Sequence, residues 1–295
     1  MFSPLVSIII PTYNHAQFLG KAIDSIRSQT VENWEAIVVN NFSQDNTTEL
    51  VSTYKDKRIR LVNFANNGNI ASSRNQGIEL TNAPYVAFLD SDDLWYPEKL
   101  SRCLYLLQKG YDLVCNSEAW IKMGAKRRVV HYGPQARATY KSLLLEGNCL
   151  STSAVVVRRE LLVSAGGFST QQEFITAEDY DLWLKLAHKG AKFGFLIDVL
   201  GEYQIHDGNE SRAALRNMDA VMAVFNHHRV FVEDQNYEKS LLRREAIIQY
   251  SGARGLQLNG QHHEAWFYFI KAVRLYPWVF RFYIAMTLNL FRLRY

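Results

Sequence analysis

The sequence predicts an α/β fold with a mixed, mostly parallel sheet, followed by a C-terminal helical region. Apolar, β-branched runs such as Val6–Ile10 alternate with helical patterns over the first 115 residues. Such alternation is typical of a sheet with helices on both faces. After about Arg212 the pattern is helical to the end of the chain. We therefore expect a first domain over residues 1–214 and a helical region over residues 215–295.

The individual elements follow from apolar runs, helical spacing and breakers. The expected strands are Val6–Ile10, Ala36–Val39, Arg58–Val62, Tyr85–Leu89, Asp112–Cys115 and Ala154–Val157, with an extended segment over Lys192–His206. The expected helices are one capped by Asn14, one over Ile70–Leu80, one from Pro97 to a stop at Gly110, and one over Tyr180–Lys189. The segment Ala253–Pro277 resembles a single tetratricopeptide-like helical hairpin.

Composition excludes several classes of protein. Of 295 residues, 48% are hydrophobic and 21% are charged, which excludes a disordered or collagen-like chain. The net charge of +4 gives no reason to expect a nucleic-acid partner. The three cysteines have no zinc or disulfide-scaffold spacing, and residues 1–10 lack the basic start of a signal peptide. We expect a cytoplasmic location.

Polar clusters follow four expected strands. They are Thr12-Tyr13-Asn14, Asn40-Asn41, Asn66-Asn67-Gly68 and Asp90-Ser91-Asp92-Asp93. In open α/β sheets, ligands bind outside the carboxyl ends of the strands. The convergence of these clusters therefore predicts a ligand site at that edge.

The acidic cluster is the clearest candidate for a metal site. Asp90, Asp92 and Asp93 leave a buried strand together and repel one another. Hard cations such as Mg²⁺ or Mn²⁺ take oxygen ligands of this kind and bring substrate phosphates with them. The alternative is a solvated acidic turn that caps the next helix.

Four other positions are candidates with weaker individual evidence. Glu178 and Asp179 begin a helix, where acidic residues ordinarily cap, but a carboxylate near a cation could act as a general base. His206 could complete a metal site or touch a diphosphate. Arg74 could contact a phosphate or ribose. Neighbours on a helix point about 100° apart, so neither His227-His228 nor His262-His263 is expected to make a natural chelate, and both pairs are expected at the surface.

These motifs together resemble family 2 glycosyltransferases, over roughly residues 4–210 and in the family's order. The matching segments are Val6-Ser7-Ile8-Ile9-Ile10-Pro11-Thr12-Tyr13-Asn14, Ser25-Ile26-Arg27-Ser28-Gln29-Thr30, Phe88-Leu89-Asp90-Ser91-Asp92-Asp93, Gly166-Gly167-Phe168 and Glu178-Asp179-Tyr180-Asp181-Leu182-Trp183. The resemblance implies the GT-A nucleotide-sugar fold, a Rossmann-like half followed by an acceptor-binding half. It also implies a metal-dependent, inverting hexosyltransferase that uses Mn²⁺ or Mg²⁺ and a nucleotide-sugar donor, most readily a UDP-sugar.

The resemblance also implies roles for single residues. Asp179 would be the general base, with Glu178 beside it, and Asp92, Asp90 and His206 would bind the metal. The nucleotide-sugar would contact Pro11, Thr12, Tyr13, Asn41, Arg74, Asp90, Ser91 and Asp93. The acceptor would be a saccharide or lipid-linked sugar of cell-surface polysaccharide or glycolipid synthesis.

One departure and two rival functions stay open. The family usually has an acidic pair where this chain has Asn40-Asn41, so the charge is lost and the choice of nucleotide is open. A nucleotide-sugar-binding homologue without turnover is one rival. A phosphohydrolase that uses Asp90 and Asp92 is the other.

The C-terminus suggests contact with a membrane surface. Leu275–Phe291 is apolar but contains Pro277 and Arg281, and it is shorter than the about 20 apolar residues that a bilayer span needs. Its aromatic residues with Arg274, Arg281, Arg292 and Arg294 suit a helix lying on the inner face of the membrane. The alternative is that they pack on the catalytic domain as its last helix.

Overall fold

A computed structural model describes residues 3–122, 127–206, 213–232 and 237–293. The chain divides into two compact units. The first comprises residues 1–139, 149–170 and 185–206, and the second comprises residues 140–148, 171–184 and 207–295. The second unit therefore takes in two segments from the middle of the chain as well as the C-terminal helices. The boundary at residues 214 and 215 stays a prediction.

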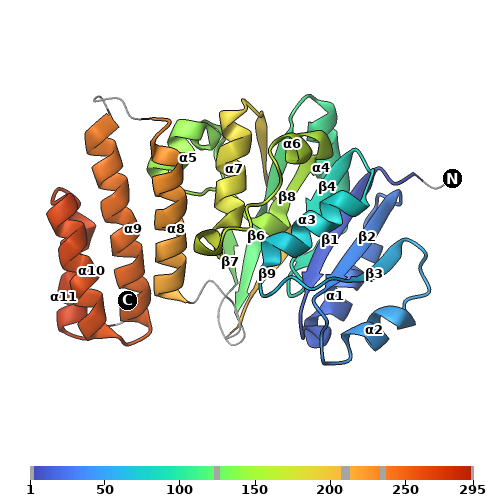
Figure 1. The fold of residues 1–295 in the computed structure, drawn as a ribbon, viewed down its shortest axis with the longest axis horizontal. Helices are drawn as coiled ribbons and strands as arrows, with labels where there is room; N and C mark the ends of the chain where they lie inside the picture. The colour runs from blue at the N-terminus through green and yellow to red at the C-terminus, as the bar shows by residue number, and fades with distance from the viewer. Residues whose placement is uncertain (1–2, 123–126, 207–212, 233–236, 294–295) are drawn as a thin grey trace. The chain divides into compact units, whose positions relative to one another are not determined.

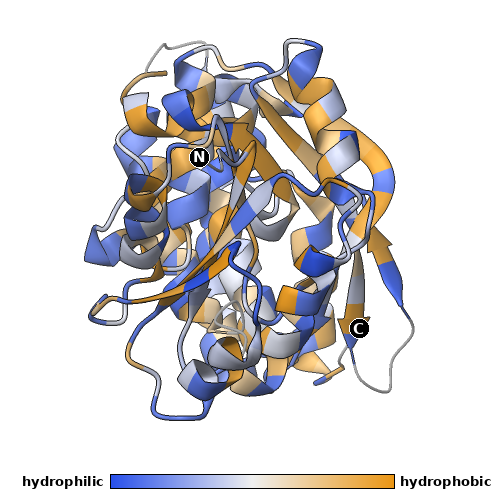
Figure 2. Ribbon diagram, turned by 90° about the vertical axis from the view of Figure 1, so that its right-hand side faces the viewer, coloured by the Kyte–Doolittle hydropathy of each residue, from blue (hydrophilic) through white to orange (hydrophobic). Residues whose placement is uncertain are grey.

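The first unit contains the parallel strands that the sequence predicts (Figure 1). Their order is β3-β2-β1-β4, and their bounds are β1 Val6–Thr12, β2 Trp34–Asn40, β3 Ile59–Asn63 and β4 Tyr85–Phe88. All seven residues of β1 are buried, as its continuous apolar run predicts. The strands are mostly hydrophobic, whereas many of the loops are hydrophilic (Figure 2).

The rest of the sheet makes it mixed. Beyond β4 the order continues β8-β6-β9-β5, and β7 pairs with β6. The bounds are β5 Leu94–Trp95, β6 Leu113–Lys122, β7 Arg128–Val130, β8 Val155–Arg158 and β9 Phe193–Ile205. Strand β8 is antiparallel to both β4 and β6, and β9 runs parallel to β6. Strand β6 is longer than the apolar run predicts, because its polar residues Asn116, Ser117 and Glu118 are also buried.

Helices complete the first unit. They are α1 Ala16–Arg27, α2 Thr47–Thr53, α3 Ile70–Leu80, α4 Lys99–Gln108 and α6 Arg159–Ser164, with short 3₁₀ turns at Gln135–Ala138 and Thr152–Ala154. The predicted cap of α1 is wrong. His15 occupies the cap position, while Asn14 has a φ of 52° and its Oδ1 accepts a hydrogen bond from the Gln44 N–H.

The second unit is helical in its described residues. Its helices are α5 Tyr140–Glu146, α8 Ala214–Arg229, α9 Glu238–Leu258, α10 His262–Leu275 and α11 Phe280–Leu290, with a 3₁₀ turn at Gln172–Phe174. Helix α7, Glu178–His188, begins in this unit and ends in the first. Helices α9 and α10 form the predicted hairpin around a small core of Ala253, Leu256, Ala265, Phe269 and Ala285. None of the described helices is long and apolar enough to cross a membrane.

Candidate functional site

The acidic cluster and His206 lie together in the first unit. Strand β4 ends at Phe88, and the loop after it carries Asp90, Asp92 and Asp93. His206 Nε2 lies 2.9 Å from Asp92 Oδ2, and the two side chains are 22% and 14% exposed. Strand β9 ends at Ile205, so His206 is the first residue after the strand.

Aromatic contacts orient the His206 ring. It stacks on Phe18 of α1, with ring centroids 4.8 Å apart and an interplanar angle of 20°. His15 meets the His206 ring edge-on, and its Nδ1 lies 2.8 Å from the Ser91 hydroxyl. The loop that carries Asp92 and the strand that carries His206 are thus both tied to the start of α1.

Asp90 has a different partner. The Nη2 of Arg74, on α3, donates to Asp90 Oδ1 at 2.7 Å, and the Arg74 side chain is only 4% exposed. The guanidinium carbon also lies 5.3 Å from the centroid of the Phe168 ring. A nearly buried guanidinium held in this way is a preorganised positive charge next to the acidic loop.

Hydrogen bonds to α3 hold the turn Gly166-Gly167-Phe168 in place. Asn75 of α3 accepts a hydrogen bond from the Phe168 N–H and donates one to the Phe168 carbonyl, at 2.9 and 2.8 Å. Gly167 has a φ of 68°, and a Cβ there would stand 2.5 Å from Asn75 Oδ1. Glycine is therefore required at residue 167 both for its backbone conformation and for the close approach of α3.

Asp93 is buried rather than open to solvent. It is 1% exposed, and its carboxylate accepts hydrogen bonds from the Ser153 hydroxyl at 2.6 Å and the Gln204 N–H at 3.1 Å. Burial, with the charge of Asp92 second, raises the pKa of Asp93 well above its usual value. Ser153 also accepts from the Asp90 N–H, so it links the acidic loop to the 3₁₀ turn before β8. The contact of Asp93 with the sugar stays a prediction.

A buried pair of charged residues, Lys99 and Glu118, accompanies the acidic loop. Both are at most 1% exposed. Lys99 Nζ donates to Asn116 Oδ1 at 2.6 Å and lies 4.7 Å from the Trp95 ring centroid. Glu118 accepts from the Tyr132 hydroxyl at 2.7 Å, and burial raises the pKa of Glu118. Burial likewise lowers the pKa of Lys99.

The residues predicted to hold the nucleotide lie where β1 and β2 end. Pro11 is buried, and Thr12 is 5% exposed with a hydroxyl that has no hydrogen-bond partner among the described residues. Tyr13 is 51% exposed. Asn41 is half-buried, its N–H donates to the Thr12 carbonyl, and its Oδ1 accepts from the Asn66 N–H. The ends of the neighbouring strands β1 and β2 therefore carry the Thr12 hydroxyl, the exposed Tyr13 ring and the Asn41 amide.

Glu178 and Asp179 belong to the second unit and have different surroundings there. Glu178 is 6% exposed, and its Oε2 accepts from the N–H of Thr176, which has a φ of 87°. Asp179 is half-buried, and the Asn148 amide lies 3.4 Å from its Oδ2. Glu178 thus supports the turn before α7, whereas Asp179 keeps the more accessible carboxylate.

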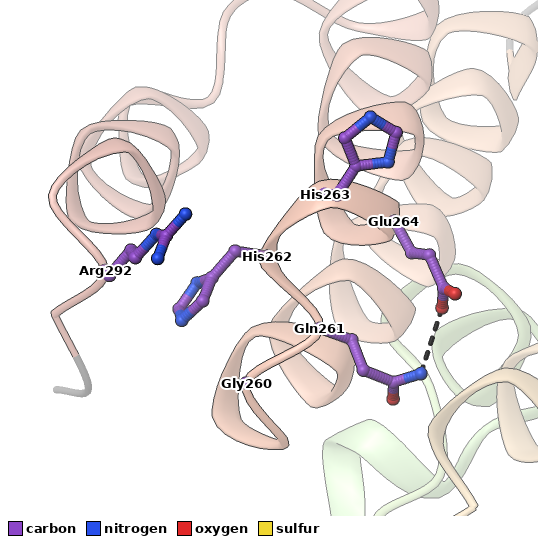
Figure 3. A pocket seen from close by; sticks show the side chains of 6 residues that line it. All are labelled: Gly260, Gln261, His262, His263, Glu264 and Arg292. Carbon is purple, nitrogen blue, oxygen red and sulfur yellow. Dashed lines mark hydrogen bonds between the residues drawn. The ribbon is translucent and has the colours of Figure 1, made fainter.

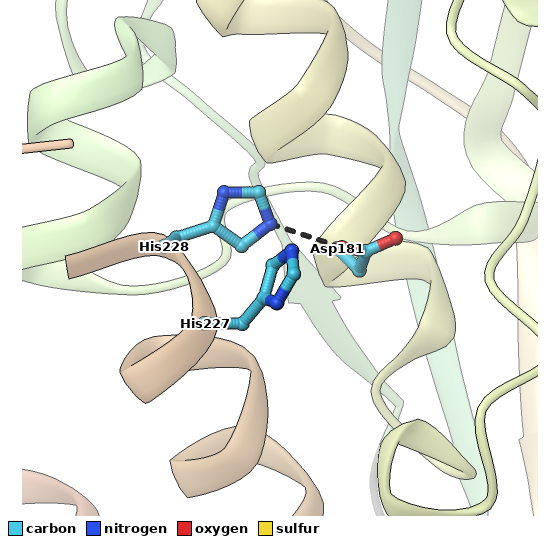
Figure 4. A group of neighbouring side chains, drawn as sticks. All are labelled: Asp181, His227 and His228. Carbon is cyan, nitrogen blue, oxygen red and sulfur yellow. Dashed lines mark hydrogen bonds and ion pairs between the residues drawn. The ribbon is translucent and has the colours of Figure 1, made fainter. Parts of the chain in front are cut away.

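The prediction that the pair His227-His228 lies at the surface is wrong for His228. His228 Nε2 lies 2.9 Å from Asp181 Oδ1, and the two side chains are 4% and 2% exposed (Figure 4). The Tyr140 hydroxyl donates to the His228 carbonyl at 2.9 Å. Burial of the α8 face that carries His228 explains the error, because helical spacing alone did not mark that face. Ligand atoms of Asp181, His227 and His228 lie within 4.8 Å of one another, so this group could hold a metal ion.

The second histidine pair is also only partly at the surface. His263 is exposed, but His262 is half-buried and its Nδ1 lies 2.9 Å from Asn289 Oδ1. Both line a pocket at the start of α10, together with Gly260, Gln261, Glu264 and Arg292 (Figure 3). None of the six was a predicted site residue.

The family model of glycosyl transferase family 2 matches residues 7–164, more than half of the chain. The chain belongs to this family. The resemblance inferred from the motifs is thereby confirmed.

Curated relatives agree with this family. A UDP-Glc:alpha-D-GlcNAc-diphosphoundecaprenol beta-1,3-glucosyltransferase of Escherichia coli, WfgD, is 32% identical over 62% of this chain and 69% of its own length. The amylovoran biosynthesis glycosyltransferase AmsB of Erwinia amylovora is 28% identical over 73% of this chain and 77% of its own.

The solved structures show the fold. The mannosyltransferase PcManGT of Pyrobaculum calidifontis, in complex with GDP-Man and Mn²⁺, matches with a TM-score of 0.63 and 19% identity over 99% of this chain and 86% of its own. S. aureus TarS 1-349 in complex with UDP-GlcNAc matches with a TM-score of 0.60 and 18% identity over 91% of this chain and 89% of its own. The expected GT-A fold with a C-terminal helical region is confirmed.

Sequence reasoning missed the residues of this family 2 member that support the acidic loop. Phe18 and Ser153 are ordinary helix or turn residues in the sequence, and only long-range contacts reveal them. Lys99 could have been found, because a lysine on the apolar side of a helical pattern, next to Leu100 and Cys103, is unusual.

Proposed function

We propose that the chain is an inverting, metal-dependent glycosyltransferase that moves a sugar from a UDP-sugar to a hydroxyl of a saccharide or lipid-linked acceptor. The observation that carries the proposal is the pairing of Asp92 with His206 and of Asp90 with Arg74 in one unit. A family 2 chain with this arrangement has anionic ligands and a fixed cation where a sugar diphosphate would bind.

The residues present fit a divalent cation. A carboxylate and an imidazole, Asp92 and His206, already face each other at 2.9 Å, and Mn²⁺ accepts both donor types. Asp90 could add an oxygen while it keeps its bond to Arg74. When bound, the cation would supply positive charge to the departing diphosphate. The PcManGT complex with Mn²⁺ supports this choice of metal.

Asn41 and the names of similar proteins support a UDP-sugar as the donor. The name of WfgD gives UDP-Glc as its donor, and TarS was solved with UDP-GlcNAc, whereas PcManGT was solved with GDP-Man. The Asn41 side chain can accept and donate, and the Thr12 hydroxyl is unpartnered, so both could pair with a uracil edge. Tyr13 would offer its exposed ring to the base.

We assign the proton transfer to Asp179 as part of this proposal. The Asp179 carboxylate would take the proton of the acceptor hydroxyl as that oxygen attacks the anomeric carbon. Attack from the face opposite the leaving diphosphate inverts the configuration at that carbon. Glu178 would keep the turn before α7 in place, and Arg74 would hold Asp90 and add positive charge for the diphosphate.

The acceptor belongs, by our proposal, to cell-surface polysaccharide or glycolipid synthesis at the cytoplasmic side of the membrane. The names of WfgD and AmsB, with a diphosphoundecaprenol acceptor and amylovoran biosynthesis, support this class. No nucleic-acid partner is proposed.

The test is a titration of nucleotide-sugars by calorimetry with Mn²⁺, followed by a turnover assay with the donors that bind. We expect a UDP-sugar to bind and to be consumed in the presence of a saccharide or lipid-diphosphate acceptor. Binding without turnover on any acceptor would favour the non-catalytic homologue. Release of phosphate from simple esters with no sugar transfer would favour the phosphohydrolase.

A further inference from the structure

Helix α11 has two apolar sides, and only one of them is buried. Phe282 and Ala285 are at most 2% exposed and pack inside the second unit, where the Phe282 ring stacks on Tyr250 at 4.9 Å. Phe280 and Ile284 are 77% and 48% exposed. In a helix, residues four and seven apart share a side, so Phe280, Ile284 and Phe291 form one outward stripe. A second apolar stripe facing solvent is not needed to hold the helix to its unit.

Helix α10 and the link to α11 also expose apolar residues. Phe267 and Ile270 are 63% and 41% exposed, on the side of α10 opposite its buried residues. Trp278, in the link, is 84% exposed, the highest value among the large exposed hydrophobic residues. We call Phe267, Ile270, Trp278, Phe280, Ile284 and Phe291 the C-terminal apolar surface. Exposed aromatic residues gathered in this number mark an interaction site.

The charge of the same segment has one sign. Residues 265–295 contain five basic residues and no Asp or Glu. Lys271 and Arg274 are exposed on α10, and Arg281 and Arg292 are exposed beside the apolar residues of α11. This segment alone carries +5, more than the net charge of +4 of the whole chain. The occupant of the surface is therefore expected to be negatively charged as well as apolar.

We propose that the C-terminal apolar surface docks on an anionic lipid bilayer, with α10 and α11 lying in the interface. Aromatic side chains suit the boundary between headgroups and acyl chains, and exposed Lys and Arg suit anionic headgroups. A second copy of this chain fits less well, because two such surfaces would bring equal positive charges together. The proposal stands on the second unit alone and does not depend on the donor, the acceptor or the metal.

The test is flotation of the full chain with vesicles of phosphatidylglycerol and phosphatidylcholine, compared with phosphatidylcholine alone. We expect binding to the anionic vesicles and a steep loss of binding at high salt. Two double variants remove the two contributions separately, Trp278→Ser with Phe280→Ser, and Lys271→Glu with Arg274→Glu. Each should weaken partition onto anionic vesicles by about tenfold or more.

Matched controls use exposed residues of the first unit. Ile197 is 78% exposed, so Ile197→Ser removes a similar apolar group, and Lys57→Glu with Lys189→Glu makes the same charge change. Both controls should bind as the wild type does, and circular dichroism should show all four variants folded. Equal loss in the controls, no binding by the wild type, or unchanged binding by both surface variants would overturn the proposal. So would self-association of the wild type through this surface without vesicle binding.

Discussion

His206 Nε2 lies 2.9 Å from Asp92 Oδ2, although the two residues are 114 positions apart in the chain. Asp92 comes from the loop after β4 and His206 from the end of β9, so the pair forms only when the mixed sheet is complete. The stacked ring of Phe18 fixes the orientation of the imidazole. This pair is the centre of the metal site that we propose.

Replacing Asp92 by Ala should remove both activity and its dependence on a divalent cation. We expect a loss of about a hundredfold or more, because a bound metal contributes several kcal/mol to stabilising transition-state charge. Turnover is measured with and without Mn²⁺ after treatment with EDTA. The control is Asp198→Asn, an exposed carboxylate on β9, which should change neither. Full activity of the wild type in EDTA would exclude the metal role.

Replacing Asp179 by Asn should abolish transfer and leave nucleotide binding nearly intact, because only the proton acceptor is lost. The expected decrease in kcat is 10²–10⁴-fold, roughly the contribution of general acid–base catalysis. Calorimetry with the nucleotide checks the binding. Transfer by the variant within about tenfold of wild type would contradict the assignment of Asp179 as the base.

Alanine substitutions at Gly166 and Gly167 distinguish the cost of a strained backbone from the cost of a steric clash. Gly166 and Gly167 both have positive φ, 78° and 68°, but a Cβ on Gly166 meets nothing within 4 Å. Gly166→Ala should therefore lower stability by about 1–2 kcal/mol. Gly167→Ala should cost more, since its Cβ would clash with Asn75 Oδ1, and should also weaken sugar-nucleotide binding through Arg74. Equal unfolding midpoints for the two variants in urea would refute this account.

Glu118→Gln should stabilise the protein increasingly as pH rises. Burial raises the pKa of Glu118 in the folded state. The folded state therefore holds the proton more tightly, and the wild type loses stability between the unfolded pKa near 4.5 and the raised folded value. Gln keeps the capacity to accept from Tyr132 without the charge. The difference in unfolding free energy between variant and wild type should grow as the pH rises above about 4.5, and a constant difference would contradict the prediction.

The sequence alone was sufficient to predict the parallel strands and the position of the acidic loop. Val6–Ile10 and Tyr85–Leu89 are short apolar runs. In an α/β pattern, such runs followed by polar clusters indicate buried strands whose carboxyl ends face a ligand site. The pairing of β6 with the antiparallel strand β8 and the parallel strand β9 was not predictable, because partners distant in sequence leave no local periodicity.

Buried polar residues account for two errors of the sequence analysis. Strand β6 was expected to end at Cys115, yet Asn116, Ser117 and Glu118 are buried and continue it. His228 was expected at the surface, yet Asp181 satisfies it inside the second unit. Burial of such groups depends on partners far away in the chain, and no local pattern reveals them.

The most direct test of the proposed function is the stereochemistry of the product. A purified enzyme is given α-configured UDP-sugars, Mn²⁺ and a GlcNAc-diphosphate-lipid acceptor, and the new linkage is read from the anomeric proton by NMR. We predict a β-linked product from the wild type, formed roughly 10²–10⁴-fold more slowly by Asp179→Asn. An α-linked product, or release of free sugar with no product on the acceptor, would contradict the account.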